Sequence, residues 1–352
     1  MFGRLAIRLS EQDSSALYPA LLGEAEAGGR VRCRLCARLC SLPEGKVGYC
    51  GVRINKKGRL YSLNYGRLVA MHADPIEKKP LNHFHPGSYV FSIATVGCNF
   101  ACQYCQNYDI SQRRIVQEPY TPIQRILEFT RAYHCQGITG TYNEPTIEAE
   151  YLIDLMKEAK KKGYFTTWVS NGYLTPEAVD LIAPHLDAIT VDFKGSGNKD
   201  FYRRYILVPS AEPIYETLKL LKMKGVHIEV TDLIVPVPTG AEIEDITKLA
   251  AWIAANLGEE TPFHLLRFHP DYRMLDIPST PFEVLKKGLK AAKEAGLKHV
   301  YLGNVPDGEY ENTTCPFCGA LCIERRGFWL VSNHLKNGNQ CPSCGHKLNI
   351  VP

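Results

Sequence analysis

From about residue 89 to residue 305 the sequence repeats one theme, a short β-branched run followed by a turn and an amphipathic helix. The predicted strands span residues 89–95, 137–142, 165–170, 188–193, 228–235, 263–268 and 299–303. The predicted helices span residues 147–162, 176–185, 214–224, 243–257 and 282–295. Strict alternation implies parallel strands with right-handed crossovers, so the fold class is α/β. The number of units suits a partial (β/α)6-type barrel.

A dinucleotide-binding fold is disfavoured because no GxGxxG motif opens a helix after the first strand. In a parallel barrel the chemistry gathers where strands end and helices begin. Polar residues just after the predicted strands are therefore the first candidates for a site.

The 352 residues exceed the size at which a single core stops growing, so we expect a main domain with smaller modules. The expected boundaries are a cysteine-rich N-terminal module over residues 1–88, the barrel over residues 89–309 and a zinc ribbon over residues 310–352. The first fifteen residues lack the apolar stretch of a signal peptide, and no long apolar run follows, so a cytoplasmic location without a membrane partner is expected. A net charge of +4 is too weak a bias to predict nucleic-acid binding.

The thirteen cysteines are hard to interpret as disulfides in a chain expected to be cytoplasmic, so metal binding is the better interpretation. Eleven of them fall into three groups with ligand spacing. The groups are Cys33, Cys36, Cys40 and Cys50; Cys98, Cys102 and Cys105; and Cys315, Cys318, Cys341 and Cys344. Of the other two, Cys135 is expected to be a small buried hydrophobe and Cys322 a spare thiol.

The central group follows the first predicted barrel strand, with Cys98, Cys102 and Cys105 in a CxxxCxxC arrangement. A 4Fe-4S cube usually takes four thiolates, so three ligands without an evident fourth leave one iron open for catalysis. Zinc is disfavoured here because a loop with three cysteines needs a distant fourth ligand to complete a tetrahedron.

This spacing, with Tyr104 just before the last cysteine, resembles the signature of the radical S-adenosylmethionine (SAM) superfamily. The resemblance implies that SAM chelates the open iron and that Tyr104 belongs to the cofactor site. It also implies that one electron from the cluster cleaves SAM to methionine and a 5'-deoxyadenosyl radical, which abstracts hydrogen from a substrate. Such an enzyme needs a reductant such as ferredoxin or flavodoxin.

Three further strand ends carry groups suited to holding SAM. Glu144, after the second strand, is expected to accept from the SAM ammonium group. Ser170 and Asn171 follow the third strand, at the level of the ribose. At the fourth strand end, Lys194 near Asp192 is expected to pair with the SAM carboxylate.

Over the barrel the chain is similar to activating enzymes of the pyruvate formate-lyase type. Those enzymes carry Gly-Gly-Glu-Pro where this chain has Tyr142-Asn143-Glu144-Pro145, so the resemblance implies that Asn143 contacts SAM through its side chain. The chain also resembles the radical SAM member of the AmmeMemoRadiSam system, in the segments CRLCARLC, GYCGVR, DPIEKKPL, HPGS and GNV. Memo-type and AMMECR-type proteins are the partners that this resemblance implies.

The C-terminal cysteines form two CPxCG knuckles, Cys315–Cys318 and Cys341–Cys344, which predict a structural zinc ribbon with an iron site as the alternative. The N-terminal cysteines allow two interpretations. CxxCxxxC is compact enough for a second iron-sulfur cluster, whereas Cys50-Gly51 resembles a zinc knuckle; zinc is the interpretation we favour.

The sequence thus predicts a radical SAM enzyme with an unidentified substrate, whose class as an oxidoreductase or a lyase stays open. One alternative is a glycyl-radical enzyme activase. Another is a non-enzymatic binding module in which the barrel only carries the ribbon. The polar strand ends beside the cysteine loop favour the enzyme.

Overall fold

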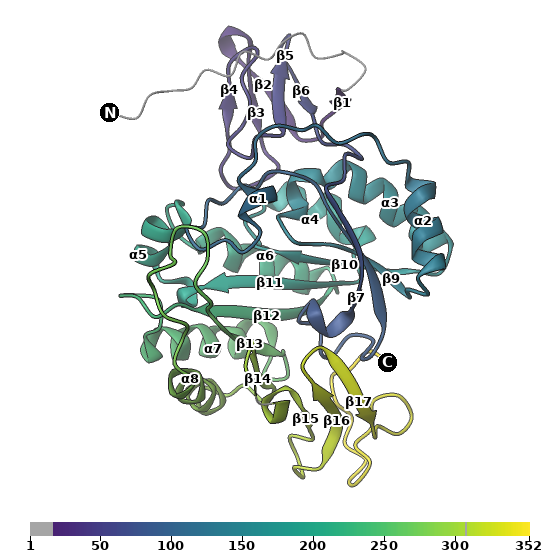
Figure 1. Ribbon diagram of the computed structural model, residues 1–352, viewed down its shortest axis with the longest axis vertical. Helices are drawn as coiled ribbons and strands as arrows, with labels where there is room; N and C mark the ends of the chain where they lie inside the picture. Colours follow the sequence, from purple (N-terminus) through teal and green to yellow (C-terminus); the bar gives the residue numbers. More distant parts are fainter. Residues whose placement is uncertain (1–16, 307) are drawn as a thin grey trace.

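The computed structural model describes residues 17–306 and 308–352. Its largest element is an eight-stranded sheet in the order β14-β13-β12-β11-β10-β9-β8-β7 (Figure 1). The strands are β7 (Ala70–Pro75), β8 (Tyr89–Ala94), β9 (Gly137–Gly140), β10 (Phe165–Ser170), β11 (Ala188–Lys194), β12 (His227–Ile234), β13 (Phe263–Arg267) and β14 (Val300–Gly303). Strands β8 to β14 are parallel to their neighbours, whereas β7 is antiparallel to β8.

The order of the strands in the sheet follows the order of the chain, so every crossover steps the same way, as it does in a barrel. The parallel α/β prediction is confirmed, and each predicted barrel strand is found with its bounds shifted by two residues at most. The carboxyl ends of all seven parallel strands lie at one edge. That edge carries the site described below.

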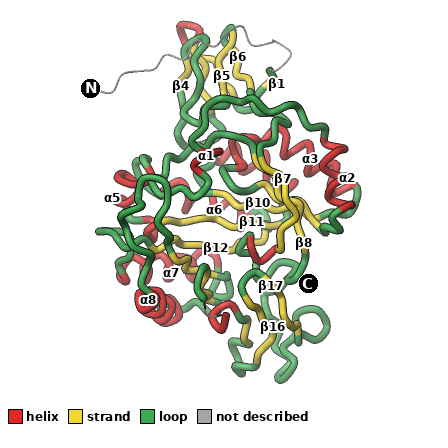
Figure 2. Tube along the Cα trace, viewed as in Figure 1, coloured by secondary structure: helices red, strands yellow, loops and turns green. Residues whose placement is uncertain are grey.

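The major helices lie around the sheet (Figure 2). They are α2 (Ile123–Ala132), α3 (Ala149–Lys161), α4 (Pro176–Ile182), α6 (Glu212–Met223), α7 (Ile243–Leu257) and α8 (Phe282–Glu294). All but α2 were predicted. Local chemistry sets their ends: Thr175 caps α4 by accepting from the Ala178 backbone N–H at 3.2 Å, with Pro176 in the first turn.

Before β7 the chain forms two small antiparallel sheets, whose strands were not predicted from the sequence. One contains β1 (Tyr18–Pro19), β6 (Arg59–Ser62) and β5 (Arg53–Lys56), and the other contains β2 (Gly23–Glu26), β3 (Arg30–Cys33) and β4 (Ser41–Leu42). Strands of two to four residues are too short to show an alternating pattern in the sequence.

The C-terminal segment forms a sheet of β15 (Thr313–Thr314), β16 (Leu321–Arg326) and β17 (Trp329–Asn333). This sheet and the N-terminal sheets lie at opposite ends of the molecule (Figure 1). After β17 the chain returns to the barrel, where the Val351 N–H donates to the His83 carbonyl at 2.8 Å. Among the described helices, none has the length and apolarity that crossing a membrane requires.

Candidate functional site

A cavity of about 480 Å³ lies at the carboxyl edge of the parallel sheet. Cys98, Cys102 and Cys105 line it, so the structure brings the three central cysteines to one space. Residues 77–80 and Asn82 also line it, together with Arg325 of β16 and Phe328 of the turn between β16 and β17. The volume lies in the range of small-molecule and cofactor sites.

The three central thiols belong to a tight loop directly after β8. The Phe100 N–H donates to the Cys98 sulfur at 3.3 Å, and the Cys105 sulfur lies 3.1 Å from the Ser111 hydroxyl. Within the described chain these three sulfurs do not lie within 4.8 Å of one another. Their separation therefore fits ligands to different irons of one cluster better than ligands of one ion.

Burial raises the pKa of all three thiols, that of Cys102 to about 12. Lys194 opposes this rise at Cys102 and Cys105. A buried thiol releases its proton when it binds a metal centre, because the metal then supplies the positive charge beside the sulfur. The cysteines thus have the chemistry of metal ligands, and a cation stands beside two of them.

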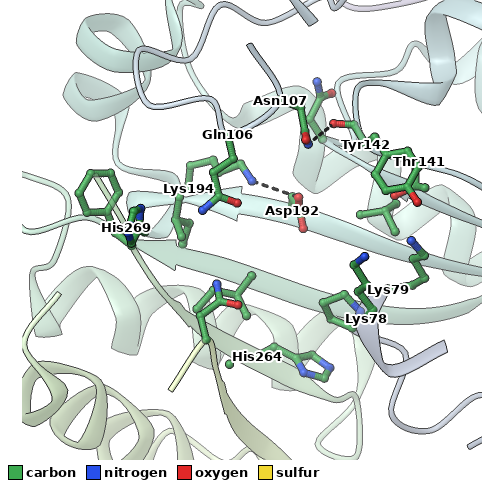
Figure 3. Close-up of a pocket in the computed structure, with 18 of the residues that line it drawn as sticks. Lys78, Lys79, Gln106, Asn107, Thr141, Tyr142, Asp192, Lys194, His264 and His269 are labelled. Carbon is green, nitrogen blue, oxygen red and sulfur yellow. Dashed lines mark hydrogen bonds and ion pairs between the residues drawn. The ribbon is translucent and has the colours of Figure 1, made fainter. Parts of the chain in front are cut away.

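Lys194 lies at the end of β11 and forms an ion pair with Asp192 at 3.0 Å (Figure 3). Both residues line the cavity, and Thr231 donates a hydrogen bond to Asp192. Burial would lower the pKa of Lys194, but Asp192 and the neighbouring cysteines outweigh that effect, so the pKa is raised. The ammonium group therefore stays charged beside the cysteine loop.

Asn143 connects the end of β9 to the cysteine loop. Its Nδ2 donates to the Thr95 carbonyl at 2.6 Å and to the Gly97 carbonyl at 2.9 Å. Its Oδ1 is buried and has no hydrogen-bond partner, although the residue lines the cavity. An orphaned buried acceptor is costly, so a donor from a bound molecule fits this position.

Glu144 lies at the end of β9, where its carboxylate is held by other residues of the protein. Its side chain is completely buried and is not among the residues that line the cavity. Oε1 accepts from the Thr146 N–H, the Thr146 hydroxyl and the Ser170 hydroxyl at 3.0, 2.6 and 2.8 Å, and Oε2 accepts from the Asn171 N–H at 2.8 Å. This geometry makes Glu144 a positioning residue that joins the ends of β9 and β10.

The other expected residues of the cofactor site line the cavity. Ser170 and Asn171 do so at the end of β10, and the Asn171 amide donates to the Asn99 side chain at 2.7 Å. Tyr104 is buried against Phe201 and Phe268, and its hydroxyl has no partner.

Several cavity residues were not predicted from the sequence. Lys79 forms a buried ion pair with Asp74 at 2.7 Å, and His264 lies 2.8 Å from Glu229. Lys78, Lys79 and His264 come from segments other than β11, as Figure 3 shows. The alternation of side chains along β13 places His264 on the cavity side, but nothing in the sequence pairs β13 with residues 77–82.

The four C-terminal cysteines lie together, as predicted for a ribbon. The Cys315 and Cys344 sulfurs are 3.7 Å apart, and those of Cys318 and Cys341 are 3.6 Å apart. A tetrahedral zinc site with Zn–S bonds of ~2.3 Å has sulfurs about 3.8 Å apart. The set fits one tetrahedral ion, zinc or iron. Cys322 lies outside this set.

Comparison with known proteins places these features in a family. The chain is 43% identical over 336 residues to the uncharacterized protein MJ0808 of Methanocaldococcus jannaschii, covering 94% of this chain and 99% of that protein. The sequence model of the radical SAM superfamily matches residues 92–250, which include the cysteine loop and Lys194. This chain belongs to the radical SAM superfamily. Membership of this superfamily makes the chain an enzyme and excludes the non-enzymatic binding module.

Two further proteins share lower identity with this chain. A pyruvate formate-lyase-activating enzyme of Clostridium pasteurianum is 26% identical over 215 residues, covering 56% of this chain and 87% of that enzyme. Among solved structures, Streptococcus suis SuiB bound to S-adenosylmethionine has a TM-score of 0.48 and 13% identity, covering 65% of this chain and 55% of that one.

Proposed function

We propose that this chain is the radical SAM enzyme of an AmmeMemoRadiSam system, with its 4Fe-4S cluster on Cys98, Cys102 and Cys105. One observation carries the proposal: the three thiols of the cysteine loop, the charged Lys194 and the orphaned oxygen of Asn143 all line one cavity. When bound, the cluster and SAM supply one-electron cleavage of SAM to methionine and a 5'-deoxyadenosyl radical that abstracts hydrogen from the substrate.

The residues of the chain bind and orient the SAM molecule. Asn143 Oδ1 accepts from the SAM ammonium group, and Lys194 pairs with the SAM carboxylate while keeping its contact with Asp192. An ammonium group has three donors, so Lys194 can serve both carboxylates. Ser170 and Asn171 lie on the next strand, at the level of the ribose. Glu144 holds these two strand ends in register.

The wall formed by His264, Lys79 and Arg325 faces the substrate. Arg325 comes from the C-terminal sheet, which thus adds to the walls that limit the access of water to the reacting atoms. The substrate stays unidentified, and the enzyme class, oxidoreductase or lyase, depends on it.

A reductant is required by the chemistry of the superfamily, and we propose a cytoplasmic ferredoxin or flavodoxin for this role. Memo-type and AMMECR-type proteins are the proposed partners of the system. Glycyl-radical activation is the alternative function, consistent with the activating enzymes among the relatives. A glycine-centred radical formed on an added protein, detected by electron paramagnetic resonance, would favour that alternative.

The test is formation of 5'-deoxyadenosine by the anaerobically reconstituted protein with dithionite as reductant. Replacing Cys98, Cys102 or Cys105 by alanine should abolish product formation while the metal of the C-terminal ribbon is retained. Cys135→Ala is the matched control, because Cys135 is also buried but does not line the cavity. Product formation by any of the three ligand variants would refute the assignment of the cluster.

A further inference from the structure

The four N-terminal cysteines lie next to one another although they come from separate turns. The Cys33 N–H donates to the Cys40 carbonyl at 2.9 Å, so β3 and the loop after it close on each other. Burial raises the pKa of Cys36, and nearby Cys33, Cys50 and Cys40 raise it further. All four thiols are therefore within electrostatic reach of one another.

Their arrangement differs from that of the C-terminal ribbon in the same molecule. The ribbon sulfurs all lie within 4.8 Å of one another, as the ligands of one ion must. In the described part of the chain no three of the N-terminal sulfurs meet that condition. Thiolates that bind different irons of a cluster stand further apart than thiolates that share one zinc ion. The wider spacing favours a cluster.

A second observation concerns Arg53, which follows Cys50 closely and is only 1% exposed. Its two terminal nitrogens bind Glu150 at 2.6 Å each, and one of them also reaches the Ile147 carbonyl. Its Nε is buried and has no partner. The positive charge acts on Cys33 and Cys50, lowering the pKa of both against the larger effect of burial.

A buried guanidinium with an unused N–H beside thiols fits a negatively charged, sulfur-rich centre. Hydrogen bonds to the sulfurs and burial both tune such a cluster. Glu150 already neutralises the arginine, so the unused donor, rather than the charge alone, indicates an additional acceptor.

The N-terminal cysteines also touch the loop of the central cluster. Arg114 Nη1 donates to the Cys50 carbonyl at 2.8 Å and to the Cys98 carbonyl at 3.1 Å. One nitrogen atom thus joins a cysteine of each group. The backbone of one cysteine group therefore lies directly beside the backbone of the other.

From this geometry we infer that Cys33, Cys36, Cys40 and Cys50 bind a second iron-sulfur cluster, which passes electrons to the central one. One electron from a ferredoxin-class or flavodoxin-class reductant reduces the N-terminal cluster, and transfer of that electron to the central cluster reoxidises it. Cys36 and Cys40 are partly exposed, so the N-terminal group is open to a docking reductant. The relay rests on the proposed function, whereas the presence of the second cluster does not.

The first experiment is metal and sulfide analysis of the anaerobically reconstituted full chain. Two 4Fe-4S clusters and one ribbon ion predict about eight irons, eight sulfides and one zinc per chain. Zinc at the N-terminal group predicts about four irons and two zincs, and that result would overturn the inference. This measurement needs no variant, so misfolding cannot obscure it.

The second experiment isolates the N-terminal cluster in the triple variant Cys98→Ala, Cys102→Ala, Cys105→Ala. It should retain about four irons and sulfides and a reduced-cluster paramagnetic resonance signal. Adding Cys36→Ser and Cys40→Ser should remove them, whereas adding Cys135→Ser should not. A triple variant without iron or sulfide would refute the second cluster. This result does not depend on whether the parent chain cleaves SAM, so the second cluster and the proposed function are tested separately.

The relay is tested by the rate at which a flavodoxin-class protein reduces the central cluster, followed by its resonance signal. Cys36→Ser with Cys40→Ser should slow this reduction at least about ten-fold relative to Cys135→Ser. An unchanged rate would show that electrons bypass the N-terminal group.

Discussion

A Cβ atom on Gly97 would lie 2.3 Å from the carbonyl oxygen of Cys50. Gly97 also has a φ of +94°, a conformation that side chains other than glycine rarely adopt. The turn of the N-terminal cysteine group and the turn before Cys98 can pack against each other only because this residue has no side chain.

Gly97→Ala is therefore expected to separate the two turns and to lower both the stability and the iron content. Overpacking against backbone costs about 1 to 3 kcal/mol beyond the conformational strain. Gly163→Ala is the matched control, because Gly163 has a φ of +78° but no atom within 4 Å of the added carbon. Equal losses of stability in anaerobic denaturation of the two variants would show that the contact with Cys50 is unimportant.

Lys194→Met is expected to weaken SAM binding about ten-fold to a hundred-fold, because one charge-assisted contact with the SAM carboxylate is lost. SAM affinity is measured anaerobically through its effect on the resonance spectrum of the central cluster. Lys224→Met removes a surface lysine that pairs with Asp180 and should leave the affinity unchanged. The site would be misplaced if both variants bound SAM equally well.

Glu144→Gln is expected to act on stability. The Glu144 carboxylate accepts four hydrogen bonds from three residues. In glutamine an NH2 group replaces one carboxylate oxygen, and this group cannot accept the hydrogen bonds that the oxygen accepted. The expected loss is about 1 to 3 kcal/mol in anaerobic chemical denaturation. A ten-fold loss of SAM affinity with unchanged stability would instead show direct contact between Glu144 and SAM.

Cys341→Ala with Cys344→Ala is expected to release the ribbon ion and to lower the melting temperature by roughly 5 °C or more, because metal binding contributes to folding. Cys322→Ala provides the comparison, since this thiol is also buried but lies outside the tetrahedral set. It should keep its metal, as measured by mass spectrometry of the holoprotein. Loss of metal from Cys322→Ala would mean that the ligand set is wrong.

Asp232 predicts a pH effect on stability. Burial raises its pKa from 3.8 to about 6, although Ser196 donates to both carboxylate oxygens. Between these values the folded chain holds more protons than the unfolded chain, so the contribution of Asp232 to stability falls as pH rises from about 4 to about 6.

Asp232→Asn should remove this dependence. Its stability relative to the parent chain should rise across the same pH interval and then stay constant, as measured by denaturation at a series of pH values. Asp200→Asn changes an exposed aspartate and should show no such trend. A parallel pH dependence in the Asp232 variant and the parent chain would contradict the assignment.

The barrel could be predicted closely because its strands alternate with long amphipathic helices, several of which end just before a glycine, as at Gly163 and Gly225. The N-terminal sheets could not, because their strands have two to four residues. Strand β7 was also missed. It pairs antiparallel with β8 and no long helix joins the two strands, so β7 lies outside the strand-helix alternation.

The candidate site also has some features that could be predicted from the sequence and others that could not. Asn143 and Lys194 were chosen for their position after a strand, and both line the cavity. It could not distinguish Glu144, which turns into the protein and joins two strand ends. Sequence position gives the edge of the sheet on which a residue lies, whereas side-chain direction depends on the partners available in the folded chain.

The cavity draws its walls from residues inside and outside the segment that matches the superfamily. The cysteine loop and Lys194 lie within residues 92–250, which match the superfamily, whereas His264, Asn304 and Arg325 come after that segment. On the proposed function, the residues that bind the cluster and SAM belong to the shared segment, and the residues that face the substrate lie outside it. A change of substrate would then need changes only outside the shared segment.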